Sequence, residues 1–377
     1  MIASVLSLLL AAGPHAVTFV LDMRPAIAAK EFDPARDKVG VRGGIAPLSW
    51  GETALAADPD GDGRYAVTVT FTRAPYGGQP VAYKFKIERK EKPREGWEEG
   101  RNRQLVLKKA SQKESRAFGA QTDPVPLSRV GRIEVLAAFP SEWIPARRVQ
   151  VYLPLGYTKE TERRYPVLYL HDGQNVFDAA EAGMEWQVDE AAESLVKKGE
   201  IEPLIVVAID NSEARTDEYT PNGGKAALYA RFLREELKPF VDRTYRTLPE
   251  AATTAVGGAS HGGLVSLWLA LEHPHTFGNA LALSTSAMWD DETIVKRVQA
   301  LPAKLPVRIW LEVGVREGES FLASNRHLRD ALVAKGWTLG GDLHYDEQED
   351  GAHDEISWAS RVPGMLAVLS PREPRAR

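Results

Sequence analysis

The first part of the chain alternates apolar and polar positions with a period of two. Residues 17–21, 65–71 and 81–87 follow this pattern and are rich in β-branched and aromatic side chains, with turn-forming residues between them. A period of two places successive side chains on opposite faces of a strand, so this texture predicts half-buried strands. No stretch here has a useful helical period. The pattern therefore predicts a small all-β sandwich over residues 17–109.

After about residue 130, short and nearly continuous apolar runs alternate with stretches of helical period. Such runs are typical of strands that are buried on both faces of a parallel sheet. The predicted strands cover residues 148–153, 167–170, 205–209, 253–256, 280–283, 307–313 and 342–345, with helices over 186–198, 226–245 and 324–335. This alternation predicts a doubly wound α/β domain over residues 130–371. Residues 110–129, rich in Ser, Gln, Lys, Asp and Pro, are predicted to be a linker.

The extreme N-terminus is a separate apolar stretch. Its apolar core is followed by small residues, which resembles a secretory signal peptide, although no basic residue precedes it. We expect residues 1–16 to be a signal peptide and the protein to be secreted or periplasmic. If the segment is instead the start of a buried strand or helix, a cytoplasmic protein is expected. No later stretch has 18 uncharged apolar residues, so no membrane span is expected beyond this segment.

Composition narrows the classes of function. The 377 residues are 44% hydrophobic and 26% charged, which is ordinary for a soluble globular protein. A net charge of −5 is small for this length and argues against a nucleic-acid partner, which would require a basic surface. The chain has no cysteine, so a disulfide scaffold, a thiol nucleophile and thiolate metal sites are excluded.

The most informative motif is Gly258-Ala259-Ser260-His261-Gly262, which lies between a short apolar run and an apolar helical run. In the G-x-S-x-G pattern a serine occupies a strained turn between strand and helix, and the glycines allow the backbone to make that turn. The N-terminus of the following helix directs free N–H groups at the place where an oxyanion would form. The strand and helix around the motif favour Ser260 as a nucleophile at such an elbow.

Two further candidates follow later strands, where the functional groups of an open α/β sheet collect. His353 follows the last predicted strand on a loop that begins with a glycine, and from there it could take a proton from the serine. Glu317 follows the strand over 307–313 and could orient that histidine. Glu312, Asp346 and Asp350 remain alternative acids. The order serine, acid, histidine along the chain is the order expected of an α/β-hydrolase.

The oxyanion donors should come from two loops. The backbone N–H of His261 comes with the elbow, and the second N–H should belong to Gly173 or Gln174, after the strand over 167–170. The sequence does not separate these two residues. The imidazole of His261 remains an alternative base. The alternative for His353 is an ordinary histidine on a surface loop, without a catalytic role.

Four stretches carry a resemblance to a known family: YPVLYLHDGQ (165–174), VVAIDN (206–211) with Arg215 and EYTP (218–221), GGASHGG (257–263) and GAHD (351–354). As a set they resemble the esterases of the α/β-hydrolase fold that include enterochelin esterase-like enzymes, feruloyl esterases and acetylxylan esterases. Members of that family often carry methionine where this chain has His261, and aspartate where it has Glu317.

The resemblance implies a metal-independent carboxylic ester hydrolase that works through an acyl-enzyme and needs no cofactor. Its substrate would be a small-molecule or glycan-linked ester. Arg215 could bind an anionic or catechol-type group of the substrate, or could pair with Glu213 or Asp217. The alternative function is a binding protein for a glycan or protein partner, with a degenerate hydrolase domain.

The N-terminal domain resembles a starch-binding-type carbohydrate-binding module of the CBM20-like fold. The matching stretches are VRGG (41–44), PLSW (47–50), YKFK (83–86) and GWEEGRNR (96–103). In that family the tryptophan at the position of Trp97 stacks on sugar rings, so the resemblance implies a carbohydrate partner. The partner aromatic expected in the preceding loop is absent. The alternative is a structural domain that covers the hydrolase.

Residues 58–63 (DPDGDG) match the first half of an EF-hand loop. The closing glutamate is missing, because position twelve is Val69, and a strand follows at once. We expect a solvated turn here and no metal site.

Overall fold

The computed structural model describes residues 14–72, 80–89, 95–99, 102–119, 128–179, 184–222 and 224–369. The chain divides into two compact units. The first comprises Met1–Pro126 with Ala180–Met184, and the second comprises Leu127–Ala179 with Glu185–Arg377. No helix among the described residues is both long and apolar enough to cross a membrane.

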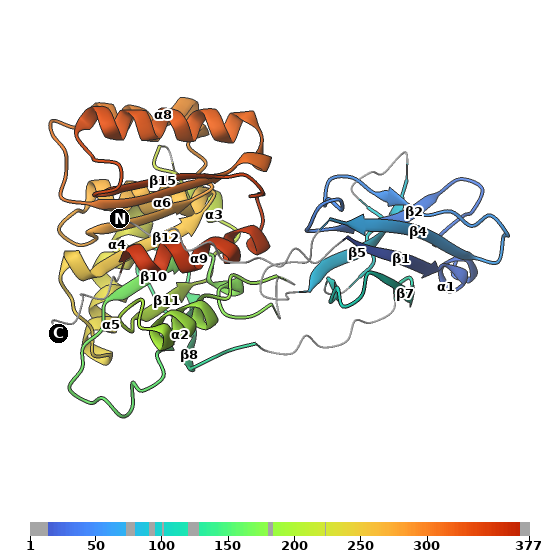
Figure 1. Ribbon diagram of the computed structural model, residues 1–377, viewed down its shortest axis with the longest axis horizontal. Coiled ribbons are helices and arrows are strands. Elements are labelled where there is room, and N and C mark those ends of the chain that lie inside the picture. Colours follow the sequence, from blue (N-terminus) through green and yellow to red (C-terminus); the bar gives the residue numbers. More distant parts are fainter. Residues whose placement is uncertain are drawn as a thin grey trace. The chain divides into compact units, whose positions relative to one another are not determined.

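The described residues of the N-terminal unit form two small sheets and one short helix (Figure 1). Its elements are β1 (His15–Asp22), α1 (Arg24–Ala28), β2 (Lys38–Gly43), β3 (Ala54–Leu55), β4 (Arg64–Phe71), β5 (Val81–Glu88), β6 (Arg103–Leu105) and β7 (Ser111–Ala117). One sheet has the order β4-β1-β7 and the other β3-β2-β5-β6. Both contribute to one hydrophobic cluster, which includes Phe19 and Phe71 from the first sheet and Val41 and Phe85 from the second.

Two predicted boundaries in this region are wrong. The predicted linker over 110–129 begins as strand β7, which pairs in parallel with β1 from Ala16↔Ser111 to Asp22↔Ala117. Backbone hydrogen bonds hold β7 although its side chains are largely exposed, so the strand shows little apolar pattern. At the other end, His15 and Ala16 belong to β1 and not to the predicted signal segment. Residues 1–13 lie outside the described residues, so the signal peptide stays a prediction.

The second unit is built on an eight-stranded mixed sheet. Its strands are β8 (Arg132–Phe139), β9 (Arg147–Leu153), β10 (Val167–His171), β11 (Ile205–Ile209), β12 (Thr254–Ala259), β13 (Asn279–Leu283), β14 (Arg308–Gly314) and β15 (Leu343–Gln348). Their order is β15-β14-β13-β12-β10-β11-β9-β8. The six strands from β15 to β11 run parallel, whereas β9 is antiparallel to both β11 and β8. The seven predicted strands are present, and β8 was missed because its side chains are mostly exposed.

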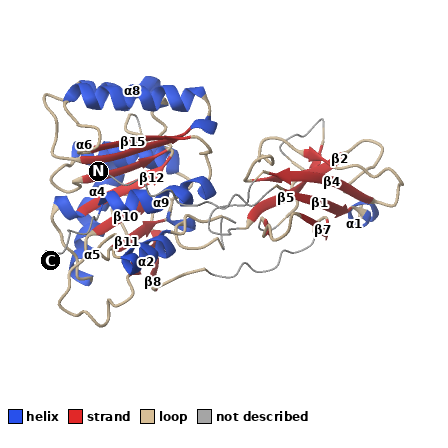
Figure 2. Cartoon of the chain, viewed as in Figure 1, coloured by secondary structure: helices blue, strands red, loops and turns tan. Residues whose placement is uncertain are grey.

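Helices cover both faces of this sheet (Figures 1 and 2). They are α2 (Val188–Lys198), α3 (Arg215–Tyr219), α4 (Ala226–Arg231), α5 (Lys238–Thr244), α6 (His261–Glu272), α7 (Trp289–Gln299), α8 (Glu319–Lys335) and α9 (Glu355–Leu369), with a π-helix at Phe232–Leu237 and 3-10 turns at Gly173–Asn175, Ala251–Thr253 and Val315–Glu317. Along β10, Val167 and Tyr169 pack in one core, with residues of α4 to α8. Leu168 and Leu170 pack in the other, with residues of α2 and α9. This doubly wound arrangement is the predicted α/β-hydrolase fold.

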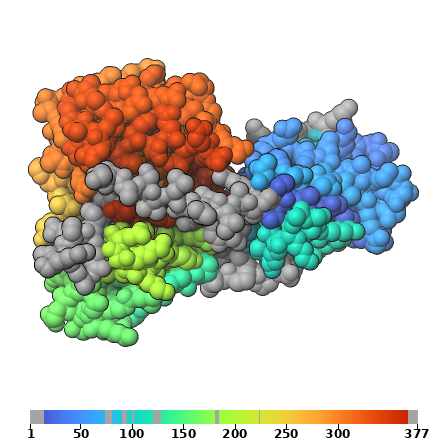
Figure 3. Space-filling view, in the orientation of Figure 1, coloured from blue at the N-terminus to red at the C-terminus, as the bar shows by residue number. Residues whose placement is uncertain are grey.

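The carboxyl ends of the parallel strands meet at one edge of the sheet. The loops after β10, β12, β13, β14 and β15 therefore lie where a site can form. The segments after β13, orange to red, form one continuous block on the face of the unit shown in Figure 3. Glu317 follows β14 and His353 follows β15 along the chain.

Candidate active site

Ser260 lies between β12 and α6 with φ 59° and ψ −124°, a conformation that non-glycine residues rarely adopt. The surrounding glycines make this turn feasible. A Cβ atom on Gly258 would lie 2.8 Å from the carbonyl carbon of Gly262, and one on Gly263 would lie 2.8 Å from Thr285 Oγ1. The Ser260 N–H donates to the Leu283 carbonyl at 3.0 Å, and Ser260 Oγ lies 3.2 Å from Ser286 Oγ. The local sequence thus produces a sharp strand-to-helix turn that presents a serine hydroxyl.

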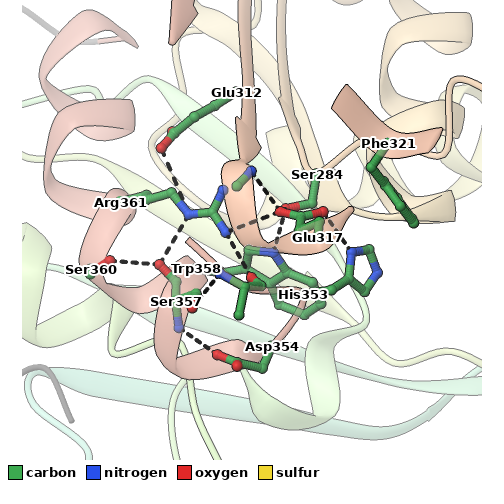
Figure 4. Close-up of polar contacts among 12 residues, drawn as sticks. Ser284, Glu312, Glu317, Phe321, His353, Asp354, Ser357, Trp358, Ser360 and Arg361 are labelled. Carbon is green, nitrogen blue, oxygen red and sulfur yellow. Dashed lines mark hydrogen bonds and ion pairs between the residues drawn. The ribbon is translucent and has the colours of Figure 1, made fainter. Parts of the chain in front are cut away.

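The loops after β14 and β15 bring His353 and Glu317 together. His353 Nδ1 lies 2.9 Å from Glu317 Oε2 (Figure 4). The imidazole also packs against two aromatic rings, with centroid distances of 4.7 Å to Phe321 and 5.2 Å to Trp358. About a third of the His353 side chain, 32%, stays exposed, whereas the Glu317 side chain is fully buried. One ring nitrogen is thereby tied to a carboxylate while the ring remains accessible.

Several donors converge on the Glu317 carboxylate. Its Oε1 accepts from Ser284 Oγ at 2.5 Å and from the Gly314 N–H at 2.7 Å, and Arg361 Nη2 lies 3.6 Å away. Burial alone would raise the pKa of Glu317, but the hydrogen bonds from His353 and Ser284 and the charges of His353 and Arg361 outweigh it and hold the pKa below its ordinary value. Glu317 is therefore ionised at neutral pH.

The partners Ser284, Trp358 and Arg361 were missed in the sequence. Trp358 Nε1 donates to Ser284 Oγ at 2.9 Å, so one hydroxyl links the indole to the carboxylate. The signals were a polar Ser-Thr-Ser run directly after the predicted strand over 280–283, and an arginine among the apolar residues near the C-terminus. Neither signal names a partner by itself.

The alternative acids lie elsewhere. Glu312 is inside β14, accepts from Trp310 Nε1 at 3.0 Å and lies 3.7 Å from Arg361 Nε. Burial raises its pKa to about 7. Asp346 accepts from Gln348 Nε2, and Asp350 is on an exposed turn. Of these carboxylates, Glu317 is the one that the described structure pairs with His353.

The loop after β10 lies beside the elbow. Asp172 adopts the left-handed conformation, with φ 58° and ψ 47°, and Gly173 and Gln174 then open a 3-10 turn. The first N–H groups of such a turn have no carbonyl partner within it. A Cβ atom on Gly173 would lie 2.5 Å from the Ile209 nitrogen, so only glycine allows this close approach to the end of β11.

Arg215 pairs with Asp172, which no sequence pattern indicated as its partner. Its Nε and Nη2 donate to Asp172 Oδ1 and Oδ2 at 2.6 Å and 2.8 Å, so the expected alternative pairing with Glu213 or Asp217 is wrong. Neighbouring parallel strands explain this choice, because Asp172 directly follows β10 and Arg215 begins α3, the first helix after β11. Asp172 Oδ2 lies 3.3 Å from where a Cβ on Gly262 would be, which places the pair against the first turn of α6.

The His261 side chain packs edge-on against Trp289, with a centroid distance of 4.7 Å. Burial, and next the charge of Arg215, lower the pKa of His261 below its ordinary value. The His261 side chain is therefore uncharged at neutral pH. The backbone N–H of His261 is the first of α6.

Trp97 belongs to the N-terminal unit and is half-buried. Its ring lies 6.1 Å from that of Trp50, centroid to centroid, and Arg42 and Lys86 lie 5.3 Å and 5.5 Å from its centroid. The neighbouring aromatic thus comes from the segment before β3 and not from the preceding loop, part of which lies outside the described residues. Cation–π contacts with both basic residues are consistent with these distances.

The Asp58, Asp60 and Asp62 carboxylates lie within 4.8 Å of one another. Asp58 accepts from the N–H groups of Gly61, Asp62 and Gly63 at 2.9–3.2 Å, which satisfies a tight turn before β4. Such side-chain-to-backbone bonds are the usual role of aspartate in turns.

Comparison with known proteins supports the assignment of the second unit. Residues 145–369 match the family model described as "Putative esterase". The chain is 27% identical over 251 residues to the uncharacterized protein YjcH of Bacillus subtilis (strain 168), covering 63% of this chain and 98% of that protein. It is 27% identical over 212 residues to the ferri-bacillibactin esterase BesA of the same organism, covering 49% of this chain and 71% of that protein. It is 28% identical to an endo-1,4-beta-xylanase/feruloyl esterase of Xylanibacter ruminicola, covering 58% and 28%.

Solved structures agree on the fold. The enterobactin esterase FES from Shigella flexneri superimposes with a TM-score of 0.64 at 21% identity, covering 88% of this chain and 87% of that one. A ferulic acid esterase superimposes with a TM-score of 0.53 at 20% identity, covering 63% and 98%. With the family match spanning more than half of the chain, this protein belongs to that esterase family and is a serine esterase of the α/β-hydrolase superfamily.

Proposed function

We propose that Ser260, His353 and Glu317 form the catalytic triad of a carboxylic ester hydrolase. The observation that carries the proposal is the 2.9 Å hydrogen bond between His353 and a buried, ionised Glu317. Both residues follow strands that lie on the same side of β12, and Ser260 follows β12 itself. A carboxylate on Nδ1 keeps the proton there, so Nε2 is free to accept one.

In this mechanism Ser260 Oγ attacks the ester carbonyl carbon while its proton moves to His353 Nε2. The oxyanion of the tetrahedral intermediate accepts hydrogen bonds from the N–H of His261 and from that of Gly173 or Gln174. The carbon–oxygen bond to the alcohol then breaks, and the alcohol leaves with the proton from His353. Water repeats the sequence on the acyl-enzyme and releases the acid. No step requires a cofactor or a metal ion.

The test is Ser260→Ala. This variant should fold normally and lose about 10³-fold or more of its turnover of 4-nitrophenyl acetate, as expected when the nucleophile is removed. A fluorophosphonate should label the native protein at Ser260 and leave the variant unlabelled. Full activity in Ser260→Ala would overturn the assignment, and an unlabelled, inactive native protein would favour a binding protein with a degenerate hydrolase domain.

For the substrate, we propose a small-molecule or glycan-linked carboxylic ester, of the enterochelin, feruloyl or acetylxylan class. Relatives include a ferri-bacillibactin esterase and a feruloyl esterase, which supports this range. The half-exposed Trp289 and Phe321, each packed on a histidine of the site, are suited to contact an aryl group. Hydrolysis rates for methyl ferulate, acetylated xylan and a catecholate tri-ester, measured side by side, would distinguish the three.

For the N-terminal unit, we propose a CBM20-like module that binds carbohydrate through Trp97. Its half-buried ring beside Trp50 offers a flat apolar surface of the kind on which sugar rings stack. Trp97→Ala should lose retention on insoluble starch, whereas Trp143→Ala, in the other unit, should keep it. Equal retention of both variants would favour a structural role for the unit.

We also propose that the N-terminal segment directs export, to the periplasm or the medium. The apolar core followed by small residues supports this. Mass spectrometry of the protein from a secreting host should show the segment removed. An intact N-terminus would indicate a cytoplasmic protein.

A further inference from the structure

Both ends of the five-residue helix α3 contact one residue, Asp172, in the loop after β10. At its first residue, Arg215 donates two hydrogen bonds to the Asp172 carboxylate, at 2.6 Å and 2.8 Å. At its last residue, the Tyr219 hydroxyl accepts from the Asp172 N–H at 3.4 Å. Asn211 Nδ2 adds a third hydrogen bond to the carboxylate, at 2.6 Å. The side chain and the backbone of Asp172 are thus held from the same neighbouring segment.

Asp172 needs such support, because it occupies the left-handed region at φ 58°, which non-glycine residues rarely adopt. The peptide plane that carries the Gly173 N–H turns with ψ of Asp172. Beyond that plane, Gly173 is already fixed against the end of β11, since any Cβ there would meet the Ile209 nitrogen. The conformation of Asp172 therefore decides where the N–H groups at the start of the 3-10 turn point.

We propose that Arg215 is a positioning residue, which with Tyr219 locks Asp172 in its left-handed conformation and so aims the oxyanion N–H of the Gly173-Gln174 turn at the substrate carbonyl. The inference rests on the proposed function, because it assigns that turn to the oxyanion site. Asp172 also lies beside the first turn of α6, since its Oδ2 is 3.3 Å from where a Cβ atom on Gly262 would be. The carboxylate that Arg215 holds is thus next to the helix that begins with His261.

This role differs from the expectation that Arg215 binds an anionic group of the substrate. Two N–H groups of the guanidinium are engaged by Asp172, and the opposite charges of the pair cancel. The Arg215 side chain is 28% exposed and also lies over the Tyr219 ring, at 5.2 Å from its centroid. An arginine neutralised in this way binds a second anion weakly, but its two hydrogen bonds hold the Asp172 carboxylate in place.

The experiment compares Arg215→Met, Arg215→Lys and Tyr219→Phe with native protein on two esters, neutral 4-nitrophenyl acetate and the anionic mono-4-nitrophenyl succinate. If Arg215 positions Asp172, Arg215→Met should lower kcat by about 10²-fold on both esters and change KM by less than about threefold. The reason is that a displaced oxyanion donor affects the transition state and not substrate binding. Arg215→Lys keeps the charge but not the bidentate geometry, so it should recover only a minor part of kcat. Tyr219→Phe removes one hydroxyl and should lower kcat by about tenfold.

A second readout separates positioning from a general loss of structure. Benzeneboronic acid forms a tetrahedral adduct with a serine nucleophile, so its inhibition constant should rise in each variant by the factor by which kcat falls. Arg326→Met is the matched control. Arg326 also makes a bidentate pair, with Glu347 at 2.8 Å and 2.6 Å, but on α8 and β15, and its loss should leave kcat within about twofold.

The proposal is overturned if Arg215→Met keeps kcat on the acetate ester and raises KM only for the succinate ester, since that result identifies an anion receptor. Unchanged boronate inhibition in the variants would overturn it as well. If Arg215→Met does not fold, Arg215→Lys and Tyr219→Phe decide alone, with full kcat in both refuting the positioning role. An inactive native protein that fluorophosphonate does not label refutes the proposed function instead, so the two failures are distinguishable.

Discussion

Glu317→Gln tests how the acid acts on His353, because the structure fixes which way the new amide must face. Ser284 Oγ and the Gly314 N–H donate hydrogen bonds to Oε1, Arg361 Nη2 lies 3.6 Å from the same oxygen, and His353 Nδ1 faces Oε2. An amide NH₂ at the Oε1 position would lose both hydrogen bonds, at a cost of roughly 1–3 kcal/mol each, and would point its protons at the Arg361 charge. The amide oxygen therefore stays at Oε1, and the NH₂ group faces His353 Nδ1.

In that orientation the amide donates to Nδ1, and the imidazole proton must move to Nε2. A histidine in this tautomer cannot accept the proton of Ser260. The expected fall in kcat is on the order of 10⁴-fold, or about 5.5 kcal/mol in the activation barrier. Stability should fall less, by about 3 kcal/mol, because the buried Arg361 loses one of its two carboxylate neighbours and keeps Glu312.

The assay is steady-state hydrolysis of 4-nitrophenyl acetate, with urea unfolding to verify that the variant is folded. Asp350→Asn changes an exposed carboxyl near His353 in the sequence and should stay within about twofold of native kcat. A folded Glu317→Gln protein that keeps more than a tenth of native kcat would refute the reasoning. Glu312 would then be the next candidate for the acid.

Three other substitutions probe the surroundings of the site. Burial raises the pKa of Glu312 to about 7, so the ionisation of Glu312 lowers the stability of the native protein as pH rises from about 4.5 to 7. In urea unfolding, the free energy that Glu312→Gln gains over native protein should therefore be larger at pH 8 than at pH 5, by at most about 3 kcal/mol. An equal gain at both pH values would contradict this. Ser284→Ala removes the hydroxyl between Trp358 and the triad carboxylate and should lower kcat about tenfold, with native kcat as the contrary result. Arg147→Met leaves the fully buried Glu218 without its bidentate partner and should cost about 3–5 kcal/mol of stability, much of it recovered in the double variant with Glu218→Leu; no loss would show the pair to be dispensable.

Local patterns in the sequence predicted much of the second unit. Buried parallel strands are continuous apolar runs, so their positions are visible without knowing their neighbours. The turn at Ser260 could also be predicted from local sequence, because its glycines are required by close contacts that involve few neighbouring residues. His353 and Glu317 were found because both follow such strands, and the carboxyl ends of parallel strands share one edge.

Strands β7 and β8, each at the edge of its sheet, were not predictable in this way, whereas the edge strands β4 and β15 were. Strands β7 and β8 present mostly exposed side chains, and backbone hydrogen bonds to a single neighbouring strand hold them in the sheet. Their sequences carry no strong period because little of their surface is buried. The linker boundary at residue 110 was wrong for this reason.

By itself, the sequence determined the candidate residues for the chemistry and the seven strands of the second unit that are apolar runs, because both depend on local patterns. The tertiary structure decided the partners: Asp172 for Arg215, Trp50 beside Trp97, and Ser284 and Arg361 on Glu317. These pairs depend on strand order, which brings together residues that are distant in the chain and have no pattern in common. Chain folding therefore turned a list of candidate residues into an arrangement of hydrogen bonds with defined directions.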